Sequence, residues 1–154
     1  MPNKLSPLLK RSAFTVVVGC GRLGASIANM LSDEGGGVVV VDQERESFNK
    51  LSASFGGMTL TGDSTDISVL DEANLGAAAA VVVVTGNDNT NIMVAQMAKE
   101  LYKVKHVVAR LYDPARESVY REFGIDTISP VVLSTREIRR LLQIEERGDI
   151  EENV

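Results

Sequence analysis

Three glycines near the start of the chain have the spacing of a phosphate-binding loop. The segment FTVVVGCGRLG, residues 14–24, is an apolar, β-branched run that breaks into Gly19, Gly21 and Gly24 and continues as a helical pattern. A loop of this kind brings bare backbone N–H groups close to a diphosphate, and the N-terminus of the following helix attracts the same anion. The motif alone is a weak signal, because chance matches to it are common.

Two charged residues stand where such a ligand would need them. Asp42 ends a second β-branched run and lies 18 positions beyond Gly24. At that spacing a carboxylate can accept hydrogen bonds from both ribose hydroxyls of an adenosine whose phosphates sit on the loop, and it would repel a 2′-phosphate. Arg22, in the first turn of the following helix, opposes the helix macrodipole, which predicts an anion beside it. The alternative for Arg22 is a solvated surface arginine.

These residues meet only if a fold brings the ends of several strands together. Strands are expected at residues 13–18, 38–41, 58–61, 77–85, 106–111 and 125–128, and helices at 22–33, 44–55, 66–73, 89–102, 114–123 and from 130 onward. Continuous β-branched strands are typical of a parallel sheet covered on both faces. We therefore predict an α/β fold, a single Rossmann-like domain with a doubly wound, parallel, six-stranded sheet in the order 3-2-1-4-5-6.

In that fold the polar residues at the strand ends converge on one crevice, between the first and fourth strands. They are the loop at 19–24, Asp42 with Gln43 beside it, Asp63 and Ser64 after the third strand, the run from Thr85 to Asn91 after the fourth, which includes Gly86 and Asn87, and Arg110 at the end of the fifth. This convergence makes the glycine motif much more specific. Asp63 has an ordinary turn role as its alternative, and Arg110 could instead form a salt bridge to a helix or to a neighbouring subunit.

Composition narrows the function classes. The net charge of −5 disfavours nucleic acid as a partner, the single cysteine fits a reducing compartment, and no apolar run approaches the ~20 residues of a membrane helix. A cytoplasmic protein is expected. The domain should occupy residues 13–144, between a loose arm at 1–12 and an acidic, disordered tail at 145–154.

Six segments together resemble one family, the N-terminal nucleotide-binding domain of Trk/Ktr potassium-uptake regulators, also called the RCK or KTN domain. The segments are VVGCGRLG (17–24), VVVD (39–42), GDSTD (62–66), TGNDNTN (85–91), VARLYDP (108–114) and FGIDTISPVVL (123–133). VARLYDP and GIDTISP have no general explanation in the Rossmann fold. Gly86 departs from the resemblance, because family members often carry asparagine there.

The resemblance implies a role for each site residue. The loop Gly19, Cys20, Gly21, Arg22, Leu23 and Gly24 would hold the phosphates, Asp42 with Gln43 the adenosine ribose, and Asp63 with Ser64 the border of the adenine. Thr85, Gly86 and Asn87 would line the far side of the crevice. Arg110 would face the distal part of the ligand.

The resemblance also implies a function without catalysis. Such domains are cytosolic, bind NAD(H) or an adenine nucleotide (ATP, ADP or AMP), and assemble into rings beneath a membrane ion-translocating subunit that they gate. The expected partners are therefore a second copy of the chain, in a homodimer or larger ring, a membrane potassium-translocating subunit, and a companion regulatory subunit. The expected location is the inner face of the cell membrane. NADP, a metal ion and a catalytic residue are not expected.

Two other functions compete with this one. The first is a small NAD-dependent oxidoreductase, or the cofactor-binding half of one. Against it, none of the three tyrosines is followed four residues later by lysine, and no substrate domain is expected after the sheet. The second is an adenosine-phosphate store or ring scaffold unrelated to potassium.

Two further features bear on chemistry and assembly. Cys20 is best explained by its small size, and a helix N-terminus beside it would lower its pKa. The last helix carries an apolar stripe of Val131, Thr135, Ile138 and Leu142, for which no covering domain is expected. Uncovered apolar patches of that size mark interfaces, which favours a dimer or ring.

Overall fold

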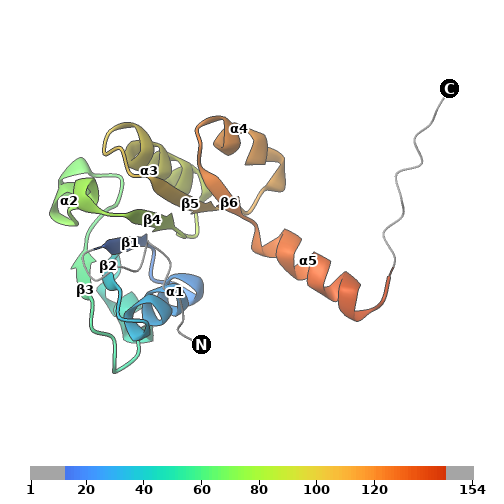
Figure 1. Cartoon of the computed structure of the whole chain (residues 1–154), viewed down its shortest axis with the longest axis horizontal. Coiled ribbons are helices and arrows are strands. Elements are labelled where there is room, and N and C mark those ends of the chain that lie inside the picture. Colours follow the sequence, from blue (N-terminus) through green and yellow to red (C-terminus); the bar gives the residue numbers. More distant parts are fainter. Residues whose placement is uncertain (1–12, 145–154) are drawn as a thin grey trace.

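Six parallel strands form one sheet in the order β3-β2-β1-β4-β5-β6 in the computed structural model, which describes residues 13–144 (Figure 1). The strands are β1 (Phe14–Val18), β2 (Gly37–Asp42), β3 (Met58–Thr61), β4 (Ala80–Val83), β5 (His106–Arg110) and β6 (Asp126–Ile128). Every neighbouring pair is parallel. The predicted fold class and strand order are confirmed, whereas the expected arm at 1–12 and tail at 145–154 lie outside the described residues.

Within residues 13–144, five α-helices connect or follow the strands. They are α1 (Arg22–Asp33), α2 (Ile67–Glu72), α3 (Asp88–Glu100), α4 (Glu117–Glu122) and α5 (Pro130–Leu141). Helix α1 lies on one side of the sheet, and α2, α3 and α4 lie on the other (Figure 1). Helix α5 instead leaves the body of the domain and points away from it. Its departure leaves its own apolar residues exposed.

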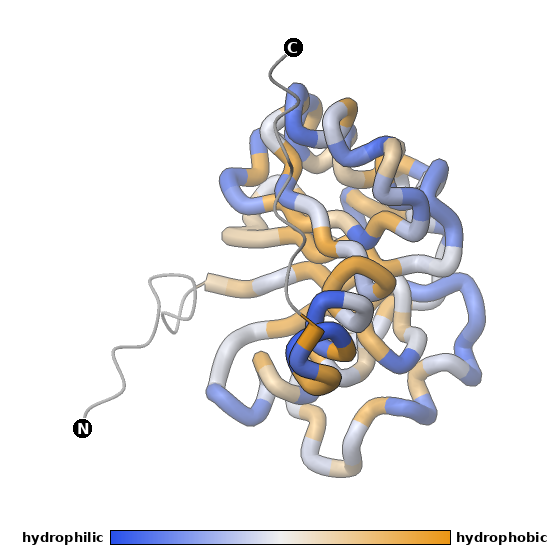
Figure 2. The backbone as a smooth tube through the Cα atoms, turned by 90° about the vertical axis from the view of Figure 1, so that its right-hand side faces the viewer, coloured by the Kyte–Doolittle hydropathy of each residue, from blue (hydrophilic) through white to orange (hydrophobic). Residues whose placement is uncertain are grey.

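The core consists of two layers because neighbouring side chains of each strand point to opposite faces. Val16 and Val18 of β1 pack in one buried cluster with residues of α2 and α3, whereas Val17 packs in a second cluster with residues of α1. All three valines are essentially inaccessible to solvent. Figure 2 shows the apolar, orange positions of the chain gathered where the strands run through the middle of the body. Burial on both faces explains why these strands read as continuous apolar runs.

Local sequence signals mark several of the helix and turn boundaries. Asp66 accepts a hydrogen bond from the N–H of Ser68 at the start of α2, and Ser129 accepts one from Val132 at the start of α5. Asp113 does the same for Ala115. Gly124 ends α4 with a φ of 69°, a left-handed conformation that favours glycine. These predicted caps and the predicted helix end are confirmed.

The prediction of an α-helix over 44–55 is wrong. The chain forms a short 3₁₀ helix at Arg45–Lys50, followed by turns. Side chains of α1 take the backbone groups that a longer helix would need: the Asn29 side-chain oxygen accepts the N–H of Ser52, and the Ser32 hydroxyl accepts the N–H of Gly56.

Two other elements are shorter than predicted. The strand expected over 77–85 is reduced to β4, because Leu75–Ala77 form a 3₁₀ turn before it. The helix expected over 114–123 begins with a 3₁₀ turn at Pro114–Arg116, and α4 follows it. The apolar sequence of α3 predicts burial almost all round the helix, yet Met93 is exposed.

Candidate functional site

A cavity of about 540 Å³ opens at the carboxyl ends of the central strands. It lies between the ends of β1 and β4, where the connections of the sheet diverge to opposite sides, which is the usual ligand position in open α/β sheets. Its size is within the range of small-molecule sites. Ten of the fourteen predicted site residues line it: Gly19, Gly21, Arg22, Asp42, Gln43, Ser64, Thr85, Gly86, Asn87 and Arg110. Their contact with a ligand stays a prediction.

The glycine loop has three glycines with three different structural roles. Gly19 has a φ of 100°, and a Cβ there would lie 2.9 Å from the backbone of Val84 in the neighbouring strand end. A Cβ on Gly24 would lie within 1.8 Å of the carbonyl oxygen of Gly19, so α1 is seated directly against the loop. A Cβ on Gly21 would meet nothing within 4 Å. Gly21 therefore leaves its backbone open to the cavity.

Asp42 joins the end of β2 to the glycine loop. One carboxylate oxygen accepts the N–H of Cys20 at 2.7 Å, and the other accepts the N–H of Glu44 at 2.8 Å. A carboxylate has about four acceptor positions, so each oxygen keeps a lone pair for a further donor. The side chain is partly exposed at the wall of the cavity.

Arg22 is the first residue of α1 and is exposed at the cavity wall. Within residues 13–144 it forms no salt bridge. Its guanidinium is therefore available to an anion on the glycine loop, and phosphate pairing stays a prediction. Arg110 likewise forms no salt bridge to the described part of the chain.

Arg110 closes the opposite wall. Its Nη2 donates to the carbonyl oxygen of Thr85 at 2.8 Å and to the Tyr112 hydroxyl at 3.1 Å, and its guanidinium lies 4.8 Å from the centre of the Tyr112 ring. Tyr112 also lines the cavity, together with Glu44, Ser47 and Thr90, of which only Thr90 belongs to the strand-end residues that the sequence predicts to converge. The position of Tyr112 within VARLYDP is the one sequence signal that points to it.

Four predicted site residues do not line the cavity. Cys20 is fully buried, Leu23 is partly buried and packs against the core cluster on the α1 side, and Gly24 lets α1 pack against the loop. The Asp63 carboxylate accepts hydrogen bonds from the hydroxyl of Thr65 at 2.7 Å and from its N–H at 2.9 Å. The bond from the Thr65 hydroxyl makes the larger contribution and the bond from the N–H the smaller one, and together they hold the pKa of Asp63 below its ordinary value. Asp63 thus makes the bonds of an ordinary turn residue, its contact with adenine stays a prediction, and Ser64 lines the cavity.

The expectation of a lowered thiol pKa is wrong. Burial, reinforced by the charge of Asp42, raises the pKa of Cys20, and its Sγ donates to the carbonyl oxygen of Ser47 at 3.4 Å. The loss of water around the sulfur disfavours the charged thiolate. The neutral thiol is therefore the form that the fold favours.

Native Cys20 is expected to react with a disulfide reagent at least about 100-fold more slowly than the urea-unfolded chain, because the reagent needs a thiolate that it can reach. Since the folded pKa lies above the unfolded one, the thiol's contribution to stability is complete at neutral pH and is lost as pH rises through the folded pKa. The rate of the reaction with the disulfide reagent is measured by the absorbance of the thiol that the reagent releases. Equal rates in the folded and unfolded chains would contradict this burial.

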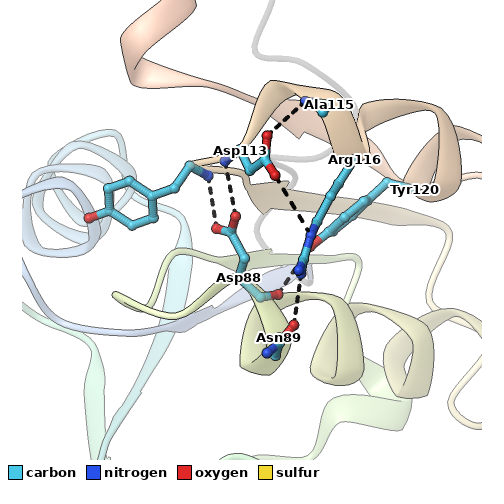
Figure 3. Close-up of polar contacts among 7 residues, drawn as sticks. Asp88, Asn89, Asp113, Ala115, Arg116 and Tyr120 are labelled. Atoms are coloured by element: carbon cyan, nitrogen blue, oxygen red, sulfur yellow. Dashed lines mark hydrogen bonds and ion pairs between the residues drawn. The ribbon is translucent and has the colours of Figure 1, made fainter.

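The first turn of α3 is tied to the segment that follows β5 (Figure 3). The Asp88 carboxylate accepts the N–H groups of Tyr112 and Asp113 at 2.8 and 3.0 Å, and the Asp88 carbonyl accepts the Tyr120 hydroxyl at 3.0 Å. Asn89 accepts a bond from Arg116 at 2.8 Å. The loop at the end of β4 and the loop at the end of β5 are therefore held together as one wall.

The part of the chain that the structure describes contains neither a candidate metal-binding cluster nor a candidate membrane-spanning helix. Between residues 13 and 144, no three His, Cys, Asp or Glu side chains gather in an arrangement that could hold a metal ion. In the same range, no helix has the length and apolarity needed to cross a membrane.

Comparison with known proteins identifies relatives over most of the chain. Residues 15–130 match the family model of the TrkA-N domain. "Trk system potassium uptake protein TrkA" of Streptomyces coelicolor is 41% identical over 128 residues, which are 82% of this chain and 57% of that protein. A Trk system potassium uptake protein TrkA homolog of Pyrococcus horikoshii is 32% identical over 126 residues, which are 81% of this chain and 55% of that protein. The chain thus spans about half the length of these relatives.

Solved structures of similar fold have lower sequence identity. The TrkA-N domain of inner membrane protein ybaL from Escherichia coli superposes with a TM-score of 0.76 at 18% identity, covering 85% of this chain and 97% of that one. The Kef C-terminal domain of Shewanella denitrificans in its AMP-bound form gives 0.71 at 18%, covering 86% and 82%. The GsuK channel bound to NAD gives 0.68 at 19%, covering 92% and 24%. At these identities the likeness concerns the fold.

Proposed function

The chain belongs to the TrkA-N domain family, and on that premise we propose that it is the nucleotide-sensing module of a potassium-transport regulator. One observation carries the proposal: the cavity at the strand ends combines the open backbone of Gly21, the exposed Arg22 and the carboxylate of Asp42. Bare backbone N–H groups and a cation suit phosphates, and a carboxylate suits ribose hydroxyls. The relatives are named Trk system potassium uptake proteins, which supports a role in potassium transport.

The ligand we propose is NAD(H) or an adenine nucleotide with an unphosphorylated ribose. Asp42 accepts from hydroxyl groups, and its negative charge would repel the 2′-phosphate of NADP. The GsuK channel bound to NAD and the AMP-bound Kef domain support both ligand classes for this fold.

Regulation fits the site better than hydride transfer. Hydride transfer needs a substrate held against the nicotinamide and a positioned proton donor. The groups that line the distal wall, Thr85, Arg110 and Tyr112, are instead bonded to one another, to the backbone or to Asn91. A ligand held there acts by favouring one of two geometries of an assembly, and it shifts their populations only as far as its affinities for them differ.

The assembly we propose uses α5. Ile138 and Leu142 are 55% and 64% exposed, and no residue of the helix is buried. On the face of the sheet that α1 covers, Val108 and Ile128 are only partly buried and belong to neither core cluster. A second copy can cover both surfaces, which yields a homodimer or larger ring. A membrane potassium-translocating subunit, and a companion regulatory subunit, would bind such an assembly at the cytoplasmic face.

Replacing Ile138 and Leu142 together with aspartate is expected to weaken self-association by about 30-fold or more, because large apolar anchors dominate interfaces. Light scattering at micromolar concentration measures the mass of the assembly. The matched control is Glu137→Ala on the same helix, which removes an exposed side chain bonded to Arg140. A wild-type protein that is monomeric at this concentration would contradict the interface.

The regulatory function itself is tested by solution X-ray scattering of the assembled wild-type protein with saturating NAD, NADH, ATP, ADP or AMP. We expect at least two of these ligands to give different scattering profiles at unchanged mass. Ligands that bind and leave every profile identical would oppose the sensing role while leaving nucleotide binding in place.

A further inference from the structure

We propose that Asn91 is the positioning residue of the distal ligand wall: its buried amide fixes Thr85 and Arg110 in the places from which they meet the ligand. The inference rests on the proposed nucleotide-binding function. Asn91 is 0% exposed and does not itself line the cavity, whereas Thr85 and Arg110 both do. Asn91 therefore acts through these two residues.

Every hydrogen-bonding position of the Asn91 amide is used. Its Nδ2 donates to the carbonyl oxygens of Thr85 at 3.1 Å and of Arg110 at 3.0 Å. Its Oδ1 accepts the N–H of Thr85 at 3.0 Å and the Thr85 hydroxyl. A side-chain amide has two donors and two acceptor lone pairs, so this network is saturated. A saturated buried network admits one arrangement of its members.

The bonds of Asn91 also determine where the Arg110 guanidinium lies. The carbonyl oxygen of Thr85 accepts one hydrogen bond from Asn91 Nδ2 and another from Arg110 Nη2, so the amide and the guanidinium are bound to the same atom. Asn91 holds the backbone of residue 110 as well. The Nε of Arg110 is buried and has no partner within the described residues. With that N–H unsatisfied, the guanidinium is held by the Nη2 bond to the Thr85 carbonyl oxygen, by the longer Nη2 bond to the Tyr112 hydroxyl, and by its contact with the Tyr112 ring.

Capping of α3 does not account for Asn91. The cap is Asn87, whose side chain accepts the N–H of Thr90. Asn91 lies one turn into the helix and joins the ends of β4 and β5 instead. These ends form the wall opposite Asp42. A ligand group that extends beyond the adenosine and its first phosphate reaches this wall, whereas AMP is held by the glycine loop and Asp42.

The test compares Asn91→Asp with the wild-type protein by calorimetric titration of NAD and of AMP. Aspartate keeps the shape and the acceptor oxygen but removes both donated bonds. We expect NAD to bind at least about tenfold more weakly and AMP to bind within about twofold of wild type. The matched control is Asn74→Asp, the same change at an exposed residue that does not line the cavity and whose side chain makes no cap hydrogen bond to the 3₁₀ turn at Leu75–Ala77. It should leave both affinities unchanged.

A double-mutant cycle separates positioning from general loss of structure. If Asn91 acts through Arg110, adding Asn91→Asp to Arg110→Gln should weaken NAD binding little further. Asn91→Ser, which removes bulk and adds no charge, replaces the aspartate variant in the cycle if that variant does not fold. NAD binding unchanged by Asn91→Asp, or NAD and AMP weakened by the same factor, would overturn the inference. A wild-type protein that binds neither nucleotide would overturn the proposed function with it.

Discussion

Gly24→Ala is expected to lower the free energy of unfolding by about 3 kcal/mol or more. The added Cβ would lie within 1.8 Å of the Gly19 carbonyl oxygen, a backbone atom that cannot rotate away. Relief of the clash would require α1 to move off the sheet, where Ala25 and Ala28 are buried. Overpacking costs typically about 1–3 kcal/mol, and a backbone clash lies at the upper end of that range or beyond it. Urea denaturation measures the change.

Gly21→Ala is the matched control, because the same methyl group enters open space. Gly21 has a φ of −79°, which alanine adopts freely, and nothing lies within 4 Å of the position that its Cβ would take. We expect stability to change by no more than about 1 kcal/mol, the cost of a poorer N-cap. Nucleotide affinity should fall, since the methyl group occupies the approach of the phosphates. Equal stability losses in the two variants would contradict the separate roles of these glycines.

Asp42→Ala is expected to weaken binding of NAD and of adenine nucleotides by at least about 100-fold. Two losses combine: the ribose loses its acceptor, and the N–H groups of Cys20 and Glu44 lose the carboxylate that holds the glycine loop to β2. Unpaired polar groups at a site built for hydroxyls cost about 1–3 kcal/mol each, and about 1.4 kcal/mol is tenfold in affinity. Calorimetric titration measures the dissociation constants.

Asp33→Ala is the matched control for charge. Asp33 is exposed and is the last residue of α1, at the end of the helix that is remote from the glycine loop. The variant therefore removes one carboxylate, as Asp42→Ala does, but away from the cavity. Its affinities should match those of the wild-type protein. Nucleotide binding that survives Asp42→Ala at full strength would contradict the ribose assignment, whatever the control shows.

The architecture of the sheet was predictable because its signals are local. The β-branched runs mark the strands, and the rule that parallel crossovers are right-handed restricts their order. Arg22–Asp33 is a helix with the predicted bounds, since it begins at the glycine loop and ends before three glycines. The caps at Asp66 and Ser129 are likewise encoded within a few residues.

The errors arise where distant parts of the chain compete for the same groups. The helix predicted over 44–55 gives way to a 3₁₀ turn because Asn29 and Ser32, on another helix, bond to the backbone of Ser52 and Gly56. No local pattern contains those contacts. The pKa of Cys20 is raised first by burial and then by the charge of Asp42, and both depend on how the loop packs against the rest of the chain.

The candidate site was predictable as a set of strand ends but not residue by residue. The topology dictates that the ends of β1, β2 and β4 meet, so Asp42 and Thr85 face one cavity. The turn after β3 determines which of two adjacent residues lines the cavity. Asp63 accepts a bond from Thr65 within this turn, and Ser64 lines the cavity. Asn91 belongs to the run 85–91 that the sequence predicts at the crevice, but nothing in the sequence distinguishes it from the other polar residues of that run. Its role emerges only from its four hydrogen bonds.

Each chain is expected to hold one adenosine-containing nucleotide with an unphosphorylated ribose in this cavity. Calorimetric titration of the wild-type protein with NAD, ATP, ADP and AMP, and with NADP for comparison, tests it most directly. We predict saturable binding of at least one of the first four at one ligand per chain, and NADP at least about tenfold weaker than NAD. Absence of binding by all of them, or NADP bound as tightly as NAD, would contradict the account.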